Sequence, residues 1–208
     1  MREGYNAINL MGSVSEPPRF DHSVLGEDMY RMIIAAKRLS GTEDLIPVTL
    51  PERLLPNGPD EMGEGMALEI DGQVRTYNRR DAFGSHLVIT VFARRLSVID
   101  EEERSFLQDR NEAELMGRLV KPPVYRLTPF SREICDMLIA VPRSFGKSDL
   151  LPCIAWGRNA RFAFELAPGD MLRISGRLQS RSYQKVTENG TDSRTAYEIS
   201  CNSLEKWA

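Results

Sequence analysis

Histidine and cysteine are scarce in this chain of 208 residues, which contains two and three of them. Only His22 and His86 could act as a catalytic histidine, so the sequence gives little support for an active site that depends on one. The three cysteines, Cys135, Cys153 and Cys201, stand alone among strand-like residues without the Cys-x-x-Cys spacing of a metal or redox site. We therefore expect buried free thiols, with neither a disulfide nor a zinc site.

Long apolar stretches are also missing. No run approaches the roughly 20 apolar residues that span a bilayer, and residues 1–6 carry no apolar segment of the secretory type. A hydrophobic fraction of 41% with 27% charged residues is typical of a globular protein. We expect a cytoplasmic protein that does not enter membranes.

No catalytic motif stands out. Residues 146–148 (GKS) echo the end of a phosphate-binding loop, but Val141 occupies the position where that loop requires its first glycine. The carboxylates fall in expected loops, and none is paired at a useful spacing with a nucleophile or a base. We expect no enzymatic activity, no cofactor and no metal.

The net charge of −3 argues at first against a nucleic-acid partner, because neutralising phosphates needs Lys and Arg. The charge is unevenly distributed, however. Residues 1–105 contain 12 basic and 18 acidic side chains, whereas residues 106–208 contain 15 basic and 12 acidic ones. The two halves are therefore expected to differ in the ligands they attract.

An internal repeat explains this division. Residues 6–12 (NAINLMG) match residues 111–117 (NEAELMG), and two further blocks recur at the same offset of 105 positions. A fourth block, residues 68–74 (LEIDGQV), matches residues 172–178 (LRISGRL) one position out of step, and a fifth apolar run follows in both halves. The chain is one unit written twice.

Each repeated block is a short β-type run bounded by Pro, Gly or polar clusters, so five strands are expected per copy. Residues 158–166 predict a helix between the third and fourth strands of the second copy, and residues 51–65 predict a degenerate one in the first. This order is that of the OB-fold, a five-stranded Greek-key barrel. We predict an all-β chain with OB-folds at residues 1–99 and 111–208, joined by residues 100–110, a solvated linker or a helix start.

One outward strand face in the second copy is basic. Because side chains alternate along a strand, Arg173, Arg177, Arg181 and Tyr183 share the face opposite the apolar residues. This pattern fits a track for a nucleic-acid backbone. It also fits an exposed strand that uses arginine for solubility and edge protection.

Two further aromatic residues favour the first interpretation. Phe145 lies in a polar loop between Arg143 and Lys147, and Trp156 ends the third strand just before Arg158. Bases stack on aromatic rings, and binders that tolerate any sequence combine such rings with a cationic groove. An isolated Trp at a strand end is more often part of a core, whereas Phe145 has few apolar neighbours with which to form one.

Residues 111–119 (NEAELMGRL), 155–158 (AWGR) and 174–183 (ISGRLQSRSY) together resemble the bacterial single-stranded DNA-binding protein (SSB) family. The resemblance covers nearly all of residues 111–208 and, less faithfully, residues 6–95. It implies stacking roles for Phe145, Trp156 and Tyr183, and polar or basic contacts from Arg118, Arg126 and Arg181. Leu150 and Pro152 depart from the family pattern, since they replace a stacking Trp and a basic residue.

The first copy lacks the stacking positions. They read Ser40, Pro51 and Arg79, and the fourth strand begins with Glu69 and Asp71 on its outward face. Acidic side chains repel phosphate, so we expect the first copy to bind weakly. Its remaining candidates for holding a strand are Arg75, Tyr77, Arg79 and Arg80.

The sequence thus predicts a binder of single-stranded DNA with little sequence preference, acting in replication, recombination or repair, with RNA left open as a ligand. The alternative is an interaction or oligomerisation module of a primosome-type accessory protein. The resemblance also implies a homodimer with four OB-folds, paired through the first strands. Residues 204–208 (LEKWA) depart from the acidic tail through which many members of that family recruit partners, so we expect no partners of that kind. The DNA-binding candidates in the second copy are Arg118, Arg126, Arg143, Phe145, Lys147, Trp156, Arg158, Arg173, Arg177, Arg181 and Tyr183.

Overall fold

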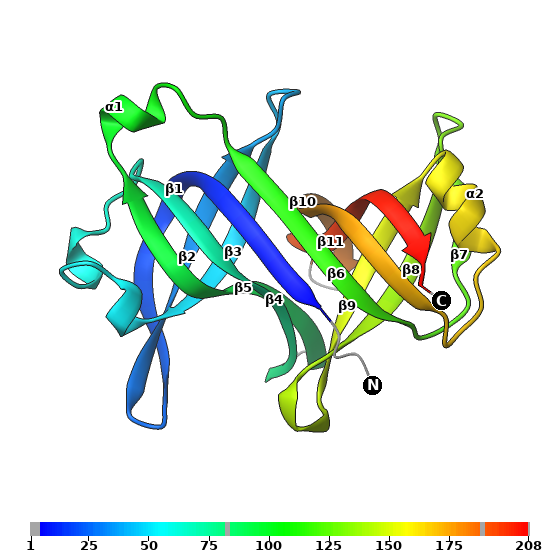
Figure 1. The fold of residues 1–208 in the computed structure, drawn as a ribbon, viewed down its shortest axis with the longest axis horizontal. Helices are drawn as coiled ribbons and strands as arrows, with labels where there is room; N and C mark the ends of the chain where they lie inside the picture. The colour runs from blue at the N-terminus through cyan, green and yellow to red at the C-terminus, as the bar shows by residue number, and fades with distance from the viewer. Residues whose placement is uncertain (1–4, 82–83, 188–189, 208) are drawn as a thin grey trace.

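Two β-barrels stand next to each other in the computed structural model, which describes residues 5–81, 84–187 and 190–207 (Figure 1). Two 3-10 turns, η1 (Glu52–Leu54) and η2 (Pro59–Glu61), replace the helix of the first barrel, as predicted. Its strands are β1 (Asn6–Val24), β2 (Glu27–Lys37), β3 (Glu43–Pro51), β4 (Ala67–Asp81) and β5 (Gly84–Ile99).

The second barrel keeps its helix, α2 (Arg158–Phe164), between the third and fourth strands of the repeat, which also confirms the prediction. It also contains one strand that the sequence did not predict, β7 (Val124–Leu127), which in the described sheet pairs only with β8 (Glu133–Pro142). The remaining elements are β6 (Arg110–Leu119), β7 (Val124–Leu127), β8 (Glu133–Pro142), η3 (Ser144–Gly146), β9 (Ser148–Trp156), β10 (Met171–Thr187) and β11 (Gly190–Lys206).

The repeated proline pair explains why the two copies differ here. Proline has no N–H to donate to a sheet, so it interrupts regular pairing. At residues 17–18 the pairing of β1 with β2 shifts register, yet the strand continues to Val24 and forms a long hairpin arm. At residues 122–123 the chain leaves the sheet, and β7 begins as a separate strand.

The first strands of the two copies join the barrels. β1 and β6 pair antiparallel from Asn6 opposite Leu115 to Met11 opposite Arg110, which makes one eleven-stranded sheet. Each barrel is closed by a further pairing, of β1 with β2 and of β6 with β8. Because the two first strands are used within one chain, the expectation that two copies pair through them is wrong. A second copy would have to meet another surface.

The repeated glycine of the two first strands permits this closure. A Cβ atom on Gly12 would lie 2.2 Å from the carbonyl oxygen of Ala35, and one on Gly117 would lie 2.6 Å from that of Ala140. Both distances are far below van der Waals contact, so only glycine lets the first strand approach the second so closely.

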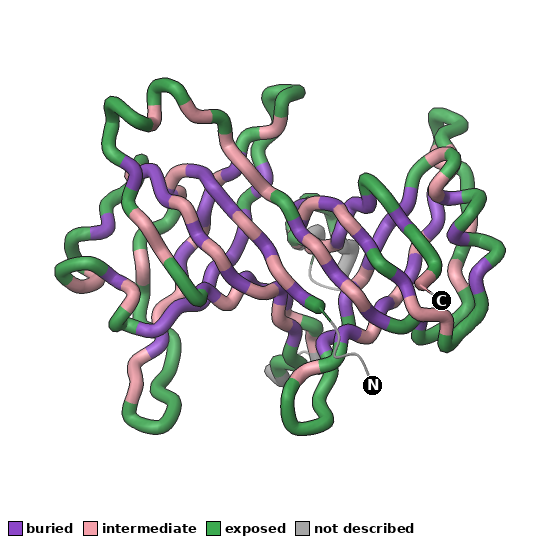
Figure 2. The backbone as a smooth tube through the Cα atoms, viewed as in Figure 1, coloured by how far each residue is buried: buried purple, intermediate pink, exposed green. Residues whose placement is uncertain are grey.

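Buried residues alternate with exposed ones along the strands (Figure 2), and most of the buried apolar ones in the described ranges belong to a cluster that extends through both barrels. Cys135, Cys153 and Cys201 lie in it as free thiols, as predicted. Burial raises the pKa of the Cys135 thiol to about 11. Among the described residues, no three His, Cys, Asp or Glu side chains are grouped so that they could hold a metal ion.

The segment between the barrels begins with a short helix, α1 (Glu101–Arg104), so the helix-start interpretation is the correct one. The Asp100 carboxylate accepts a hydrogen bond from the Glu103 N–H at 2.7 Å and caps this helix. Leu107 packs beside Met11, and Asp109 accepts a hydrogen bond from the Lys37 N–H at 2.7 Å. The segment is thus held against the first barrel. No helix in the described part of the chain has the length and apolar character needed to cross a membrane.

Candidate nucleic-acid interface

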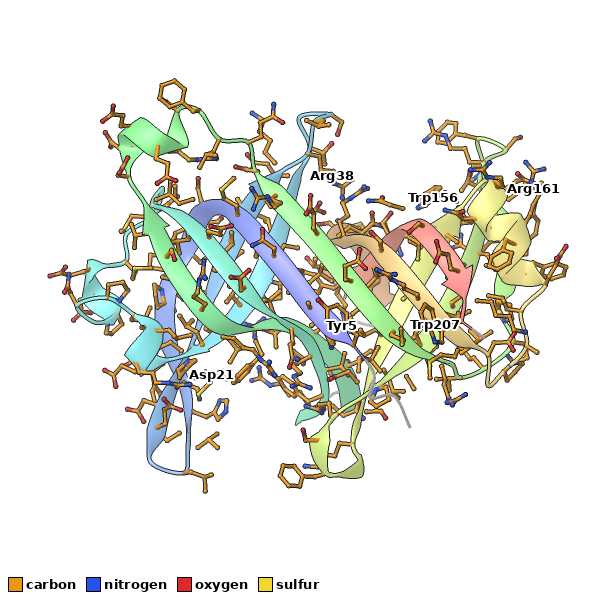
Figure 3. All side chains as sticks on the ribbon, viewed as in Figure 1. Tyr5, Asp21, Arg38, Trp156, Arg161 and Trp207 are labelled. Carbon is orange, nitrogen blue, oxygen red and sulfur yellow. The ribbon has the colours of Figure 1, made fainter. Side chains whose placement is uncertain are left out.

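The third strand of the second barrel presents an apolar surface to the outside. Residues two apart on a strand share a face, so Leu150, Pro152, Ile154 and Trp156 lie on the side of β9 opposite the barrel core. Leu150 and Trp156 are exposed and Pro152 is partly exposed, whereas Ile154 is covered and only 4% exposed. We call these four side chains the β9 face. Trp156, the last residue of β9, is 38% exposed. It lies at the same end of the barrel as Arg161 on α2 (Figure 3).

Phe145 stands at the other end of β9, in η3. Its side chain is 99% exposed, and its backbone adopts the left-handed conformation at φ 62° and ψ 33°. Residues other than glycine rarely adopt this conformation, which turns Phe145 out of the β8–β9 hairpin. Since β9 rises about 3.3 Å per residue, Phe145 and Trp156 lie roughly 26 Å or more apart along the strand. One base cannot contact both rings, but a strand of several nucleotides can.

The arm formed by β10 and β11 carries the third predicted aromatic residue. Tyr183 lies opposite Arg194, and Arg181 lies opposite Ala196, in the part of the hairpin that projects beyond the barrel. The side chains of Arg181 and Tyr183 are both exposed. They are therefore accessible to a ligand that passes along the arm.

The predicted cations of the second barrel divide into three groups, and the first is free. Lys147, Arg158 and Arg181 are exposed, and their side chains make no hydrogen bond or ion pair with any residue that the structure describes. Lys147 follows Phe145 in the hairpin, and Arg158 begins α2 just after Trp156. Each end of the β9 face therefore has an unpaired cation beside its aromatic ring.

The second group already has partners. Arg126 makes two hydrogen bonds to Asp136, of 2.7 Å and 3.3 Å, and these bonds raise the pKa of its guanidinium. Arg173 lies 3.8 Å from Glu114, and Arg118 donates to the Gly169 carbonyl oxygen at 3.0 Å. Their charges are less available to phosphate than those of the first group.

Two more predicted cations, Arg143 and Arg177, lie where the barrels meet. Arg143 approaches Asp149 at 3.4 Å, and Arg177 approaches Asp44 at 4.0 Å. Sequence reasoning missed both aspartates. The repeat offset of 105 relates Asp44 to Asp149, so the alignment of the two copies contained the signal.

The first barrel has fewer candidates. Tyr77 and Arg79 are exposed on β4, and Arg75 is bound to Asp149 at 3.0 Å. The side chain of Arg80 lies outside the described residues. Ser40, in the β2–β3 turn, is exposed and has no aromatic ring to offer where the second copy has Phe145.

Residues 110–206 match the sequence model of the single-strand binding protein family. Over 81 residues the chain is 36% identical to the single-stranded DNA-binding protein of Clostridium tetani. The matched region covers 36% of this chain and 56% of that protein. It is 33% identical over 103 residues to single-stranded DNA-binding protein 1 of Staphylococcus aureus, covering 46% of this chain and 59% of the relative. The chain thus spans a little over half the length of these relatives.

The whole fold also has a counterpart of known structure. The crystal structure of the wild-type single-stranded DNA binding protein from Thermus aquaticus superposes with a TM-score of 0.78, covering 99% of this chain and 94% of that one at 22% identity. A deletion variant of the same protein also gives a TM-score of 0.78. These likenesses extend the shared fold over both barrels. The second barrel, at residues 110–206, thus matches the single-strand binding protein family, and the chain as a whole has a tandem OB-fold form.

Proposed function

We propose that the chain binds single-stranded DNA with little sequence preference, mainly through the second barrel. The observation that carries this proposal is the β9 face, which ends at both sides in an exposed aromatic ring with an unpaired cation beside it. Phe145 and Lys147 form one end, and Trp156 and Arg158 form the other. The relatives are single-stranded DNA-binding proteins, which supports the same ligand.

The chemistry of this surface suits a ligand whose bases are unpaired. Each base has a face that can stack on an aromatic ring, at about 1–3 kcal/mol per base, whatever its identity. The free cations hold the backbone without reading sequence. Stacking and phosphate contacts do not distinguish one base from another, so the expected preference for sequence is low.

The first barrel has a smaller share in this proposal. Its outward fourth-strand face begins with Glu69 and Asp71, which repel phosphate, and Arg75 is already bound to a carboxylate. Tyr77 and Arg79 remain as exposed contacts. We assign the protein a binding role in DNA replication, recombination or repair rather than catalysis.

A second candidate is an interaction or oligomerisation module of a primosome-type accessory protein. The ion pairs of Arg126 with Asp136 and of Arg173 with Glu114 favour it, because they reduce the positive charge that the outside of the second barrel offers to phosphate. This candidate predicts a folded chain that binds oligonucleotides weakly or not at all.

We also propose that two copies associate, which gives four barrels. The outer face of the joined sheet carries both signs of charge, with Glu69 bound to Arg110 at 3.0 Å and Glu114 near Arg173 at 3.8 Å. A twofold axis brings the same patch together from both copies, so a face with mixed charge can complement itself. Light scattering should give the mass of a dimer, and a strict monomer would reject this part.

Titration of the intact chain with oligo-dT tests the proposed function. Stacking on Trp156 should quench tryptophan fluorescence, and the logarithm of the affinity should fall linearly with the logarithm of the salt concentration. Binding that lacks quenching would move the interface away from Trp156. No binding even at low salt would favour the interaction module.

A further inference from the structure

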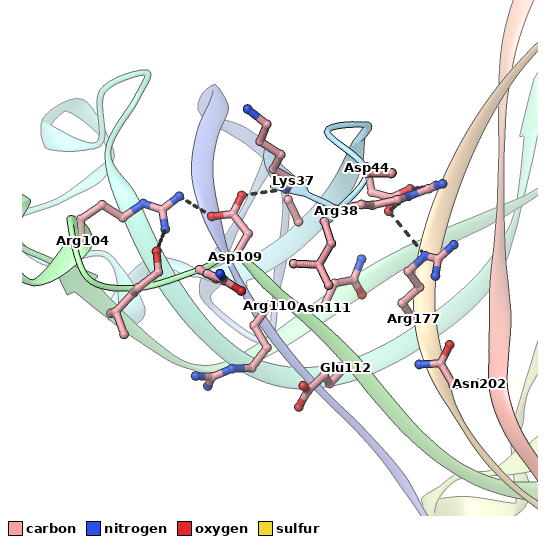
Figure 4. A pocket seen from close by; sticks show the side chains of 15 residues that line it. Lys37, Arg38, Asp44, Arg104, Asp109, Arg110, Asn111, Glu112, Arg177 and Asn202 are labelled. Atoms are coloured by element: carbon pink, nitrogen blue, oxygen red, sulfur yellow. Dashed lines mark hydrogen bonds and ion pairs between the residues drawn. The ribbon is translucent and has the colours of Figure 1, made fainter.

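A hollow of about 790 Å³ lies between the barrels (Figure 4). Residues of the β2–β3 turn, of the segment before β6 and of β10 line it. Arg38, Asp44 and Arg177 meet on one side, and the Lys37 side chain extends from its rim. Neither barrel alone forms this site, because Arg38 and Asp44 belong to the first and Arg177 to the second.

Asp44 is the centre of the cluster, and its oxygens are already occupied. Arg38 donates to both, at 2.6 Å and 2.7 Å, and the Ser180 N–H donates to Oδ1 at 2.9 Å. The carboxylate is 1% exposed. The positive charge of Arg38 therefore already neutralises the buried negative charge of Asp44, without any contribution from Arg177.

Arg177 is the cation of this cluster whose charge no carboxylate balances, because Asp44 is already paired with Arg38. Its Nε lies 4.0 Å from Asp44 Oδ2, too far for a hydrogen bond, and is buried with no acceptor among the described residues. Its one hydrogen bond runs from an Nη to Gln179 at 3.3 Å. Burial lowers the pKa of this guanidinium, and the nearby charge of Arg38 lowers it further. The positive charge of Arg177 is thus not matched by the hydrogen bonds of its guanidinium, and an anion that accepts from its Nη atoms would balance it.

The hollow lies on the same side of the sheet as the proposed DNA interface, and two buried residues, Ser200 and Ile154, separate them. Arg177 lies opposite Ser200 on β11, and Ser200 lies opposite Ile154 on β9. Residues paired across neighbouring strands share a face, so Arg177 is on the same outer surface as the β9 face. With about 4.8 Å between strands, the backbones of Arg177 and Trp156 are roughly 12 Å apart. Figure 3 shows Arg38 and Trp156 along the same upper edge of the molecule.

The opposite junction has the same arrangement but a different surface. Arg75 and Arg143 both approach the buried carboxylate of Asp149, and the Arg143 Nε also lacks an acceptor in the described part of the chain. The hollow beside them is lined by two arginines, Arg75 and Arg143, and two carboxylates, Asp21 and Glu27, whereas five Lys and Arg side chains and three carboxylates line the Arg38–Arg177 hollow. The charge surplus is therefore confined to the Arg38–Arg177 side.

We propose that Arg177, backed by Arg38 and joined by Lys37 at the rim, binds a backbone phosphate of single-stranded DNA where the strand passes from the β9 face onto the first barrel. This inference rests on the proposed function. It means that one phosphate would be bound by residues of both barrels, Lys37 and Arg38 from the first and Arg177 from the second. It places the crossing on one defined side of the molecule. The ligand group is a phosphodiester, and no base is read there.

Salt titrations of the intact chain with oligo-dT of about 30 nucleotides test the site. Each phosphate contact on a single strand contributes about 0.7 to the slope of log affinity against log salt. Arg177→Gln should reduce the slope by about 0.7, and Arg177→Lys should restore it. Lys37→Gln, which disturbs no buried group, should also reduce the slope. Arg53→Gln is the matched control, because Arg53 pairs with Glu27, neither residue lines the Arg38–Arg177 hollow, and the slope should stay unchanged.

The outcomes separate the two proposals. If wild-type protein binds and both Arg177→Gln and Lys37→Gln keep its slope, the phosphate site is wrong and the proposed function stands. If Arg177→Gln does not fold, Lys37→Gln decides alone. If wild-type protein does not bind oligo-dT, the proposed function fails and this inference fails with it.

Discussion

Asp44 on β3 and Asp149 on β9 make the same contact from opposite barrels. Asp44 accepts a hydrogen bond from the Ser180 N–H of the second barrel at 2.9 Å, and Asp149 accepts one from the Thr76 N–H of the first at 2.7 Å. The hydroxyls of Ser180 and Thr76 in turn accept from the backbone N–H that follows each aspartate, at 3.0 Å and 2.9 Å. The internal repeat therefore continues into the junction, where each barrel contributes one aspartate and receives one from the other. We call each set of two hydrogen bonds a clasp.

Removal of either aspartate should destabilise the protein strongly. Asp149→Ala leaves the Thr76 N–H and two guanidiniums without their buried acceptor, so the free energy of unfolding should fall by about 3–5 kcal/mol, and Asp44→Ala should act similarly. Urea denaturation measures both. Glu27→Ala is the control, because Glu27 pairs with Arg53 where both side chains are well exposed, and it should cost less than 1 kcal/mol. Equal losses in all three variants would contradict the clasp.

The repeated glycine of the first strands should tolerate no side chain. Gly12→Ala and Gly117→Ala each place a methyl group against a carbonyl oxygen, so each should lower the free energy of unfolding by about 1–3 kcal/mol. A Cβ on Gly63 meets nothing within 4 Å, so Gly63→Ala should change stability little. If Gly63→Ala is as damaging as the other two, close strand approach is not the cause.

The thiol of Cys135 should react slowly while the protein is folded. Burial raises its pKa to about 11, so at pH 8 roughly one thiol in a thousand is ionised, and only the thiolate attacks alkylating reagents. Reaction should accelerate once the pH approaches 11 or the protein is unfolded in urea. Mass spectrometry after a timed pulse of iodoacetamide measures this. Rapid labelling of folded protein at pH 8 would show that Cys135 is accessible.

The pairing state of each arginine should decide its part in DNA binding. Arg158 is free, so Arg158→Gln should reduce the salt slope for oligo-dT by about 0.7. Arg126 is held by Asp136, so Arg126→Gln should reduce it less. The two substitutions remove the same charge from the same barrel and so serve as controls for each other. A larger effect at Arg126 would mean that DNA displaces Asp136.

The architecture could be predicted from the sequence because it depends on local patterns that recur. The repeat, the alternation of apolar residues and the helix-forming stretch at residues 158–166 predicted two barrels, one with its helix. The short strand β7 was missed, since four residues between a proline pair and a polar turn carry too little periodicity to indicate a strand. The pairing of β1 with β6 was missed because no local pattern says which edge a strand will meet.

The candidate site was predictable only as a set of residue types. Aromatic residues near cations indicated Phe145, Trp156 and Tyr183, and all three are exposed. Which cations are free depends on partners distant in sequence, such as Asp136 for Arg126 and Asp44 for Arg177. Strand alternation places Arg173 and Arg177 on one face, but it cannot show that one lies near Glu114 and the other near the opposite barrel.

The most direct test of the central claim, that the second barrel carries the binding face, compares matched positions in the two copies. Anisotropy of labelled oligo-dT gives the affinity of the intact chain and of its variants. Phe145→Ala and Trp156→Ala should each weaken binding by about 1–3 kcal/mol, whereas Ser40→Ala, the first-barrel equivalent of Phe145, should change it little. Equal losses at Ser40 and Phe145, or full affinity without Trp156, would contradict the account.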